Sequence, residues 1–153
     1  VGSPFQKLEN LVEDLRFLKK FNPHMVGIGP FISHKDTPFG EYEAGSAKLT
    51  LKLLSIIRLL LPQALIPATT ALNTLLNDGH QQGILAGANV IMPNLSPQNV
   101  RDKYNLYDNK KHSGSEAAEG IALLRKQLAE IGYEIAIDRG DYPGVIRWAL
   151  NIK

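Results

Sequence analysis

The sequence predicts an α/β fold built on a parallel sheet. Short apolar segments alternate with longer segments in which apolar residues recur at helical spacing. Glycine or proline closes most of these segments, and no internal repeat or low-complexity linker divides the 153 residues. Strands that alternate with amphipathic helices are typical of right-handed crossovers, which place neighbouring strands in parallel.

The first predicted helix starts near Leu8 and stops near Asn22-Pro23. Its apolar face carries five residues three or four positions apart: Leu8, Leu11, Val12, Leu15 and Leu18. Charged residues fill the other face. A buried strand is predicted from Met25 to Gly29, followed by a long loop over residues 30 to 46 that is rich in proline, glycine and charge.

The middle of the chain continues the alternation of helix and strand. A leucine-rich helix is predicted for Ala47 to Leu61, and a short strand for Ala64 to Ala68. A helical region follows from Ala71 to Ala86, interrupted around Asn77-Asp78-Gly79. A third short strand, Asn89 to Met92, ends at a proline.

Helix-start signals recur in the last third of the chain. Ser96-Pro97 places serine at an N-cap and proline at the first helical position. Ser113-Gly-Ser-Glu116 resembles a capping box ahead of a helix that runs to about Ile131, with Gly132 as its stop.

The final residues predict one more strand and one more helix. Apolar residues alternate with polar or small ones at Tyr133, Ile135 and Ile137, which indicates a half-exposed strand. Asp141-Tyr-Pro opens a final short helix that carries Trp148.

Composition narrows the classes of partner. The net charge is only +2 and the basic residues are interspersed with acids, so we expect no nucleic acid partner. The longest apolar run is interrupted by Arg58 and Pro62, so we expect no membrane span. VGSPFQKLEN is not a signal peptide, and a cytoplasmic location is expected. The chain has no cysteine, so it offers no disulfide, thiol nucleophile or thiolate metal ligand.

Polar residues follow each of the three buried strands. They are Ser33-His-Lys-Asp36 after the first strand, Thr69-Thr70 after the second and Met92-Pro-Asn94 after the third. The carboxyl ends of parallel strands meet at one edge of a sheet or one mouth of a barrel, where chemistry gathers. The shared position of these clusters therefore predicts a single site.

Each cluster also has a purely structural interpretation. His34 and Asp36 fit a metal or proton relay, but also a solvated loop in which Asp36 caps a turn. Thr69 and Thr70 fit an anion site, but also the end of a strand. Met92 is by default a core residue. A dinucleotide fingerprint is not expected, because Pro30 follows Gly27-x-Gly29 and blocks a phosphate-cradling turn.

Four motifs, in order along the chain, resemble the C-terminal portion of radical S-adenosylmethionine (SAM) enzymes of the biotin synthase-like group. They are MVGIGPFISHKDTPFG, IPATTALNTL, GILAGANVIMPNLSP with RDKYNLYDNK, and GYEIAIDRGDY. Within that group they are most similar to the FeFe-hydrogenase maturases. The resemblance implies a (β/α)8 TIM-type barrel, of which this chain supplies about three parallel strands with their helices. A single partial-barrel domain would then hold the last barrel units over about 1–110 and a helix-strand-helix extension over about 111–153.

The resemblance also implies roles for individual residues. The family's SAM-binding segment matches Met92, Tyr104 and Leu106. The residues that match the lining of a substrate or anion cavity are Thr69, Thr70, Ser33, His34 and Asp36. The resemblance assigns no catalytic residue.

The opening residues depart from the family pattern. VGSPFQKL resembles the family's Gly-x-Pro-Gly-Gln-Thr turn at the end of the fifth strand. Phe5 stands in place of the second glycine and Lys7 in place of the threonine. This departure puts the usual backbone geometry of the turn in question.

The cofactors of the family would belong to the parent enzyme. A Cys-x3-Cys-x2-Cys signature binds a 4Fe-4S cluster that cleaves SAM to a 5′-deoxyadenosyl radical. This cysteine-free chain would ligate no cluster and would be inactive alone. The accessory cluster of some members is excluded as well, because His112, Gly120 and Leu123 stand in that region.

Two other interpretations stay open. The parent enzyme could be a methylornithine synthase or a biotin synthase relative, which share the barrel and the SAM chemistry. Alternatively, the chain is a non-catalytic barrel fragment that self-associates through the open edges of its sheet. The expected partners are the missing N-terminal barrel half or a second copy, together with SAM and a small-molecule substrate.

Overall fold

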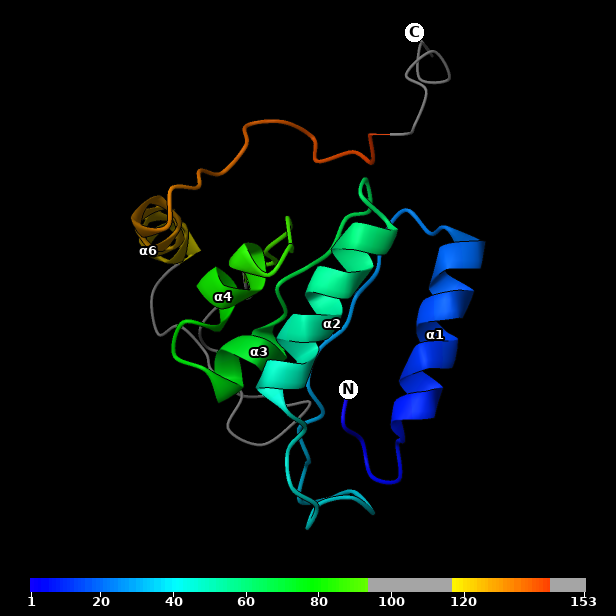
Figure 1. Ribbon diagram of the computed structural model, residues 1–153. Coiled ribbons are helices and arrows are strands. Elements are labelled where there is room, and N and C mark those ends of the chain that lie inside the picture. The colour runs from blue at the N-terminus through cyan, green and yellow to red at the C-terminus, as the bar shows by residue number, and fades with distance from the viewer. Residues whose placement is uncertain (94–116, 144–153) are drawn as a thin grey trace, which may run out of the picture.

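A computed structural model describes residues 1–93 and 117–143 of the chain. Figure 1 shows α2 between α1 on one side and α3 and α4 on the other, with α6 beyond α4. The helices of the described residues are α1 (Leu8–Phe21), α2 (Ala47–Leu60), α3 (Thr70–Leu75), α4 (Gly79–Leu85) and α6 (Ala117–Glu130).

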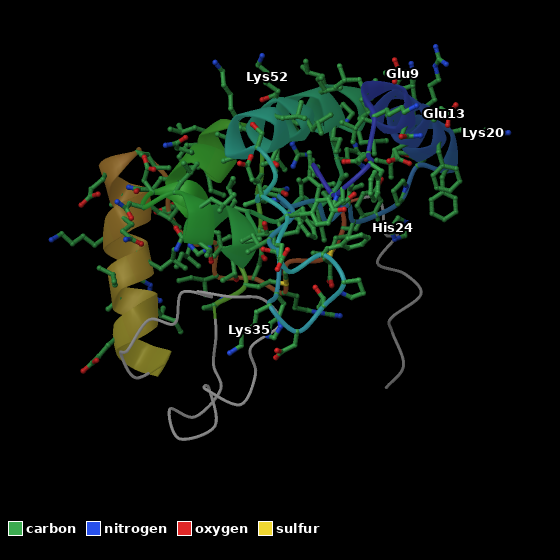
Figure 2. All side chains as sticks on the ribbon, turned by 90° about the horizontal axis from the view of Figure 1, so that it is seen from below. Glu9, Glu13, Lys20, His24, Lys35 and Lys52 are labelled. Carbon is green, nitrogen blue, oxygen red and sulfur yellow. The ribbon has the colours of Figure 1, made fainter. Side chains whose placement is uncertain are left out.

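The predicted helices before residue 93 are confirmed, with bounds close to those expected. In α1, Leu11 is buried, while Glu9 and Glu13 project outward (Figure 2). Asn22 ends α1 in a left-handed conformation with φ 50°, and its N–H donates to the Leu18 carbonyl at 2.9 Å. The Ser46 hydroxyl caps α2 by accepting from the Leu49 N–H at 3.2 Å.

The predicted interruption within residues 71–86 is also confirmed. The chain leaves the helical conformation at Leu76 and re-enters it at Gly79, which separates α3 from α4. The glycine is required there because an added Cβ would lie 2.5 Å from the Leu72 carbonyl oxygen. Gly83 is likewise pressed against Ala68, where a Cβ would come within 2.8 Å of the Ala68 Cβ.

The three expected strands are represented by two isolated parallel bridges among the described residues. Met25 bridges Leu65, and Pro67 bridges Val90. The three segments thus run parallel and lie next to one another in chain order, as β-α-β crossovers require. The ladders stay short partly because Pro67 has no N–H to donate. The three-strand sheet itself remains a prediction.

The core lies between these segments and the inner face of α2. Leu54 and Ile57 of α2, Ile66 of the middle segment and Leu72 of α3 are all almost completely buried. Leu124 and Leu128 of α6 complete the same cluster. This arrangement resembles one wall of an α/β barrel, with helices on one side of parallel segments.

The predicted strand at 133–137 is wrong for the described residues. Tyr133, Ile135 and Ile137 lie in a segment that forms no strand, and all three side chains are exposed. A strand needs a partner to satisfy its backbone groups, and no backbone bridge joins another described segment to this one. Gly132 ends α6 with φ 78°, as its position predicts.

Three sequence predictions lie outside the described residues. They are the helix start at Ser96-Pro97, the capping box at Ser113–Glu116 and the final helix with Trp148. Among the described residues, no helix is both long enough and apolar enough to span a bilayer.

The side chain of His80, on α4, is expected to make the fold sensitive to acid. Its Nε2 atom is buried without a hydrogen-bond partner among the described residues, and burial lowers its pKa from the usual 6.5. Below that pH the unfolded chain binds a proton that the folded chain resists. The free energy of unfolding therefore falls as pH drops below about 6.5, until pH passes the lowered pKa of the folded state.

Urea unfolding at several pH values checks this expectation. In His80→Leu, the loss of unfolding free energy between pH 7.5 and pH 5 should be smaller than in the parent chain. An identical loss in both proteins would show that the acid sensitivity comes from other groups.

Candidate functional site

The carboxyl ends of the first two parallel segments meet at Gly29 and Thr69. A Cβ added to Gly29 would lie 2.8 Å from the Thr69 Oγ1, so the absent side chain is what leaves room for this hydroxyl. Thr69 is the N-cap residue of α3, and its hydroxyl does not cap the helix. The Oγ1 atom is buried and has no hydrogen-bond partner among the described residues. A buried hydroxyl in this state is a ready donor for a ligand atom.

Thr70 begins α3 directly after this position and is half-buried. Its carbonyl accepts from the Thr74 hydroxyl at 3.0 Å, so the first turn of α3 is held internally. The backbone at Thr69 and Thr70 is therefore fixed by the helix.

The residue Val1 lies along the outer edge of the first parallel segment. Its ammonium group donates to the Gly29 carbonyl at 2.7 Å, and its carbonyl accepts from the Phe31 N–H at 2.8 Å. This is the bonding pattern of one parallel bridge, with Val1 opposite Pro30.

The loop that follows Gly29 folds into a local turn around His34. The Thr37 N–H and hydroxyl both donate to the His34 carbonyl, at 3.0 and 2.7 Å. The Asp36 N–H donates to the His34 Nδ1 at 3.2 Å, so the neutral imidazole carries its proton on Nε2. The Asp36 carboxylate lies 3.8 Å from Nδ1 and is largely exposed.

The same loop carries an aromatic cluster that was not predicted from the sequence. Phe39 makes edge contacts with Phe5, Phe31 and Tyr42, at ring centroid separations of 5.7 to 6.5 Å. Phe5 also contacts Tyr42 at 5.9 Å. The only signal was three aromatic residues in one loop, Phe31, Phe39 and Tyr42. The contribution of Phe5 depends on the turn before α1.

Phe5 keeps the glycine-like conformation of its turn. Its φ is +68°, which costs a residue with a side chain about 1 kcal/mol. The edge contacts with Phe39 and Tyr42 help to offset that cost. The substitution at Phe5 therefore leaves the backbone of this turn left-handed.

Comparison with known proteins adds the decisive observation. The chain is 49% identical over 140 residues to the [FeFe] hydrogenase maturase subunit HydE of Thermotoga maritima, an alignment that covers 92% of the chain and 40% of HydE. Over nearly all of its length the chain is thus similar to part of HydE, a radical SAM maturase. It is also 29% identical over 140 residues to the 3-methylornithine synthase of Methanosarcina acetivorans, covering 92% of the chain and 38% of that enzyme.

A second 3-methylornithine synthase, from Methanosarcina barkeri, is 31% identical over 101 residues, or 66% of the chain and 28% of that enzyme. No model of a known protein family matches the chain. The chain spans about two fifths of the length of the HydE relative and of the first synthase. Homology to radical SAM proteins implies a TIM-barrel-like fold.

The HydE family implies SAM and a 4Fe-4S cluster in the parent enzyme. The cluster does not fit this chain, because none of its 153 residues is a cysteine. The described part of the chain also holds no group of three side chains suited to a metal ion.

The residues matched to SAM binding are described only in part. Met92 follows the third parallel segment and is 58% exposed, so it is not the core residue that its default interpretation implies. Tyr104 and Leu106 lie outside the described residues. The structure brings Thr69 against Gly29, but within its described residues no hydrogen bond joins Ser33, His34 or Asp36 to Thr69 or Thr70.

Proposed function

We propose that this chain is the C-terminal wall of a HydE-like radical SAM barrel that acts in maturation of the FeFe-hydrogenase H-cluster. The observation that carries this proposal is the 49% identity to HydE over 92% of the chain. The parallel bridges and the bridge-like pairing of Val1 beside Pro30 support a wall that continues into further strands. The chain would contact SAM and substrate and would depend on the rest of the barrel for activity.

Thr69 is the residue best placed to contact a substrate or anion in this barrel. Its hydroxyl is buried, unpartnered among the described residues and adjacent to Gly29 at the carboxyl ends of the parallel segments. Thr70, Ser33, His34 and Asp36 would line the same cavity. Met92, Tyr104 and Leu106 would contribute to SAM binding. The domain division near residue 110 and the cytoplasmic location remain predictions.

Two measurements on the isolated chain and on a chimera test this proposal. The 153-residue chain, reconstituted with iron and sulfide, should form no 5′-deoxyadenosine from SAM, because it supplies no thiolate ligand. A chimera in which the chain replaces the aligned 140 residues of T. maritima HydE should recover SAM cleavage. Cleavage by the isolated chain, or an inactive but folded chimera, would contradict the proposal.

Thr69→Val in the chimera should raise the KM for the substrate about tenfold, because one hydrogen bond to a ligand is worth on the order of 1.4 kcal/mol. Thr74→Val is the matched control, since its hydroxyl already bonds the Thr70 carbonyl. Equal effects of the two changes would argue against a ligand contact at Thr69.

A 3-methylornithine synthase is the second candidate parent, because one such enzyme aligns over the same 92% of the chain at 29% identity. A second chimera, in which this chain replaces the aligned residues of that synthase, distinguishes the two candidate parents. We expect the HydE chimera to retain more activity, in line with its higher identity.

A further inference from the structure

The loop between the first parallel segment and α2 is closed at its base and held at its tip by separate hydrogen bonds. At the base, the Gly45 N–H donates to the Phe31 carbonyl at 2.8 Å. At the tip, the Thr37 N–H and hydroxyl both donate to the His34 carbonyl, and the Gly40 N–H donates to the Thr37 carbonyl at 2.9 Å. All of these bonds end on backbone carbonyls, so none of them requires a particular charge on a side chain.

One further bond at the tip does depend on the charge of a side chain. The Asp36 N–H donates to the His34 Nδ1 at 3.2 Å, which requires a lone pair on that atom and therefore a neutral imidazole. The same Nδ1 lies 3.8 Å from the Asp36 Oδ2. Once protonated, Nδ1 is itself a donor, so it repels the N–H and attracts the carboxylate. Asp36 thus offers the imidazole a donor for one charge state and an acceptor for the other.

The exchange needs only a small movement of an exposed group. The side chain of His34 is 22% exposed, whereas that of Asp36 is 74% exposed. The carboxylate oxygen has to approach Nδ1 from 3.8 Å to about 2.7–2.9 Å to form a charge-assisted hydrogen bond. Exposed side chains change rotamer within nanoseconds, so this approach costs no rearrangement of the core. The loop therefore has two arrangements in which Nδ1 is satisfied.

Asp36 is the charged group that faces the imidazole. The other charged residues of the loop are Lys35, which marks the loop in Figure 2, Glu41 and Glu43. Among the described residues, the ion pair of His34 is with Asp36, and no charged group of another described element pairs with it. The response of the loop to protonation is therefore assigned to Asp36.

We propose that His34 and Asp36 form a pH-sensitive switch, in which protonation of the imidazole exchanges the Asp36 N–H for the Asp36 carboxylate at Nδ1. The proton comes from solvent and binds Nδ1, while the proton on Nε2 stays in place. The loop that follows Gly29 then carries a paired carboxylate in place of a free one, beside the candidate site. Histidine is the side chain whose charge ordinarily changes between pH 5 and 8. The switch belongs to the loop itself and does not depend on the proposed function.

Nitrogen NMR and amide hydrogen exchange of the 153-residue chain test the switch. At pH 8, His34 should show the tautomer with its proton on Nε2. Between pH 8 and pH 5.5, the protection factor of the Asp36 amide should fall about tenfold, the change expected for one lost hydrogen bond. The Thr37 amide should keep its protection, because it bonds the His34 carbonyl in both states. A general loss of stability in acid would lower both protection factors, so their ratio isolates the switch.

Two asparagine variants assign the effect to His34. His34→Asn keeps a side-chain acceptor near the position of Nδ1 but cannot be protonated, so the Asp36 amide should stay protected at both pH values. His24→Asn is the matched control, because His24 is exposed and lies outside the loop, and it should retain the loss of protection. The proposal is overturned by a proton on Nδ1 at pH 8 or by equal protection of Asp36 at both pH values. It is also overturned if the loss persists in His34→Asn or disappears in His24→Asn.

Discussion

Replacing Arg58 with methionine is expected to lower the free energy of unfolding of the chain by about 3 kcal/mol. The Arg58 Nε donates to the Gly87 carbonyl at 2.8 Å. Its Nη1 donates to the carbonyls of Pro62 and Ala64, at 2.9 and 2.8 Å. One side chain thus joins the end of α2, the start of the middle parallel segment and the turn after α4.

The size of the effect follows from the hydrogen bonds that the carbonyls of Gly87, Pro62 and Ala64 lose. A hydrogen bond from a charged donor contributes about 1.5–3 kcal/mol, and contributions that share one side chain are not additive. Methionine can fill the volume but donates to none of these carbonyls. Burial lowers the pKa of the Arg58 guanidinium, but arginine stays protonated at neutral pH, so the donors persist.

Two further variants separate this role from a loss of charge. Lys52→Met removes one cation from the exposed side of the same helix (Figure 2) and should change the unfolding free energy by less than about 0.5 kcal/mol. Arg58→Lys should lower the unfolding free energy by an amount between those of Arg58→Met and Lys52→Met. An ammonium group keeps the charge but cannot donate to several carbonyls at once as the guanidinium does. Urea denaturation followed by circular dichroism measures all three. A Lys52→Met variant as unstable as Arg58→Met would show that net charge dominates.

Arg58 also shows what the sequence could not reveal. From the sequence it was only the residue that interrupts an apolar run, because nothing local indicates that carbonyls from four later positions converge on it. Its side chain is useful only once α2, α4 and the middle segment are assembled. Long-range hydrogen bonds of this kind carry no sequence period.

The helices, by contrast, were predictable because their signals are local. Ser46 at an N-cap, Asn22 at a left-handed stop and the glycine of the Asn77-Asp78-Gly79 break each act within one or two turns. The strand at 133–137 was predicted from an equally clear period, yet a strand needs a partner as well as a pattern. Periodicity reports which face could be buried and does not report whether anything buries it.

The candidate site was predictable in outline only. The sequence placed three polar clusters at the ends of three parallel segments, and the structure places Thr69 beside Gly29 in that way. It does not join His34 to Thr69 by a hydrogen bond within its described residues, because the loop closes on itself through Thr37 and Asp36. The loop forms short-range hydrogen bonds within itself in place of the expected contact between His34 and Thr69.

Gly79→Ala is expected to lower the free energy of unfolding by about 2 kcal/mol or more. An added Cβ would lie 2.5 Å from the Leu72 carbonyl oxygen and 2.5 Å from the Asn73 Cα. Both are backbone atoms of α3, so neither can rotate away, and α4 must move. Alanine gains about 0.5–1 kcal/mol in helix propensity over glycine, which is too little to offset the collision. Urea denaturation of the variant measures the net effect.

Gly27→Ala is the matched control, because it makes the same chemical change where there is room. The nearest atom to its added Cβ is the Pro67 Cγ at 3.9 Å, an ordinary contact, and its backbone is outside the left-handed region. Reduced freedom of the unfolded chain should then leave Gly27→Ala unchanged or more stable, by up to about 1 kcal/mol. Equal losses at the two glycines would mean that flexibility, rather than the approach of α4 to α3, sets the requirement for Gly79. Opposite signs would locate that requirement in the close approach of α4 to the α3 backbone at Leu72 and Asn73.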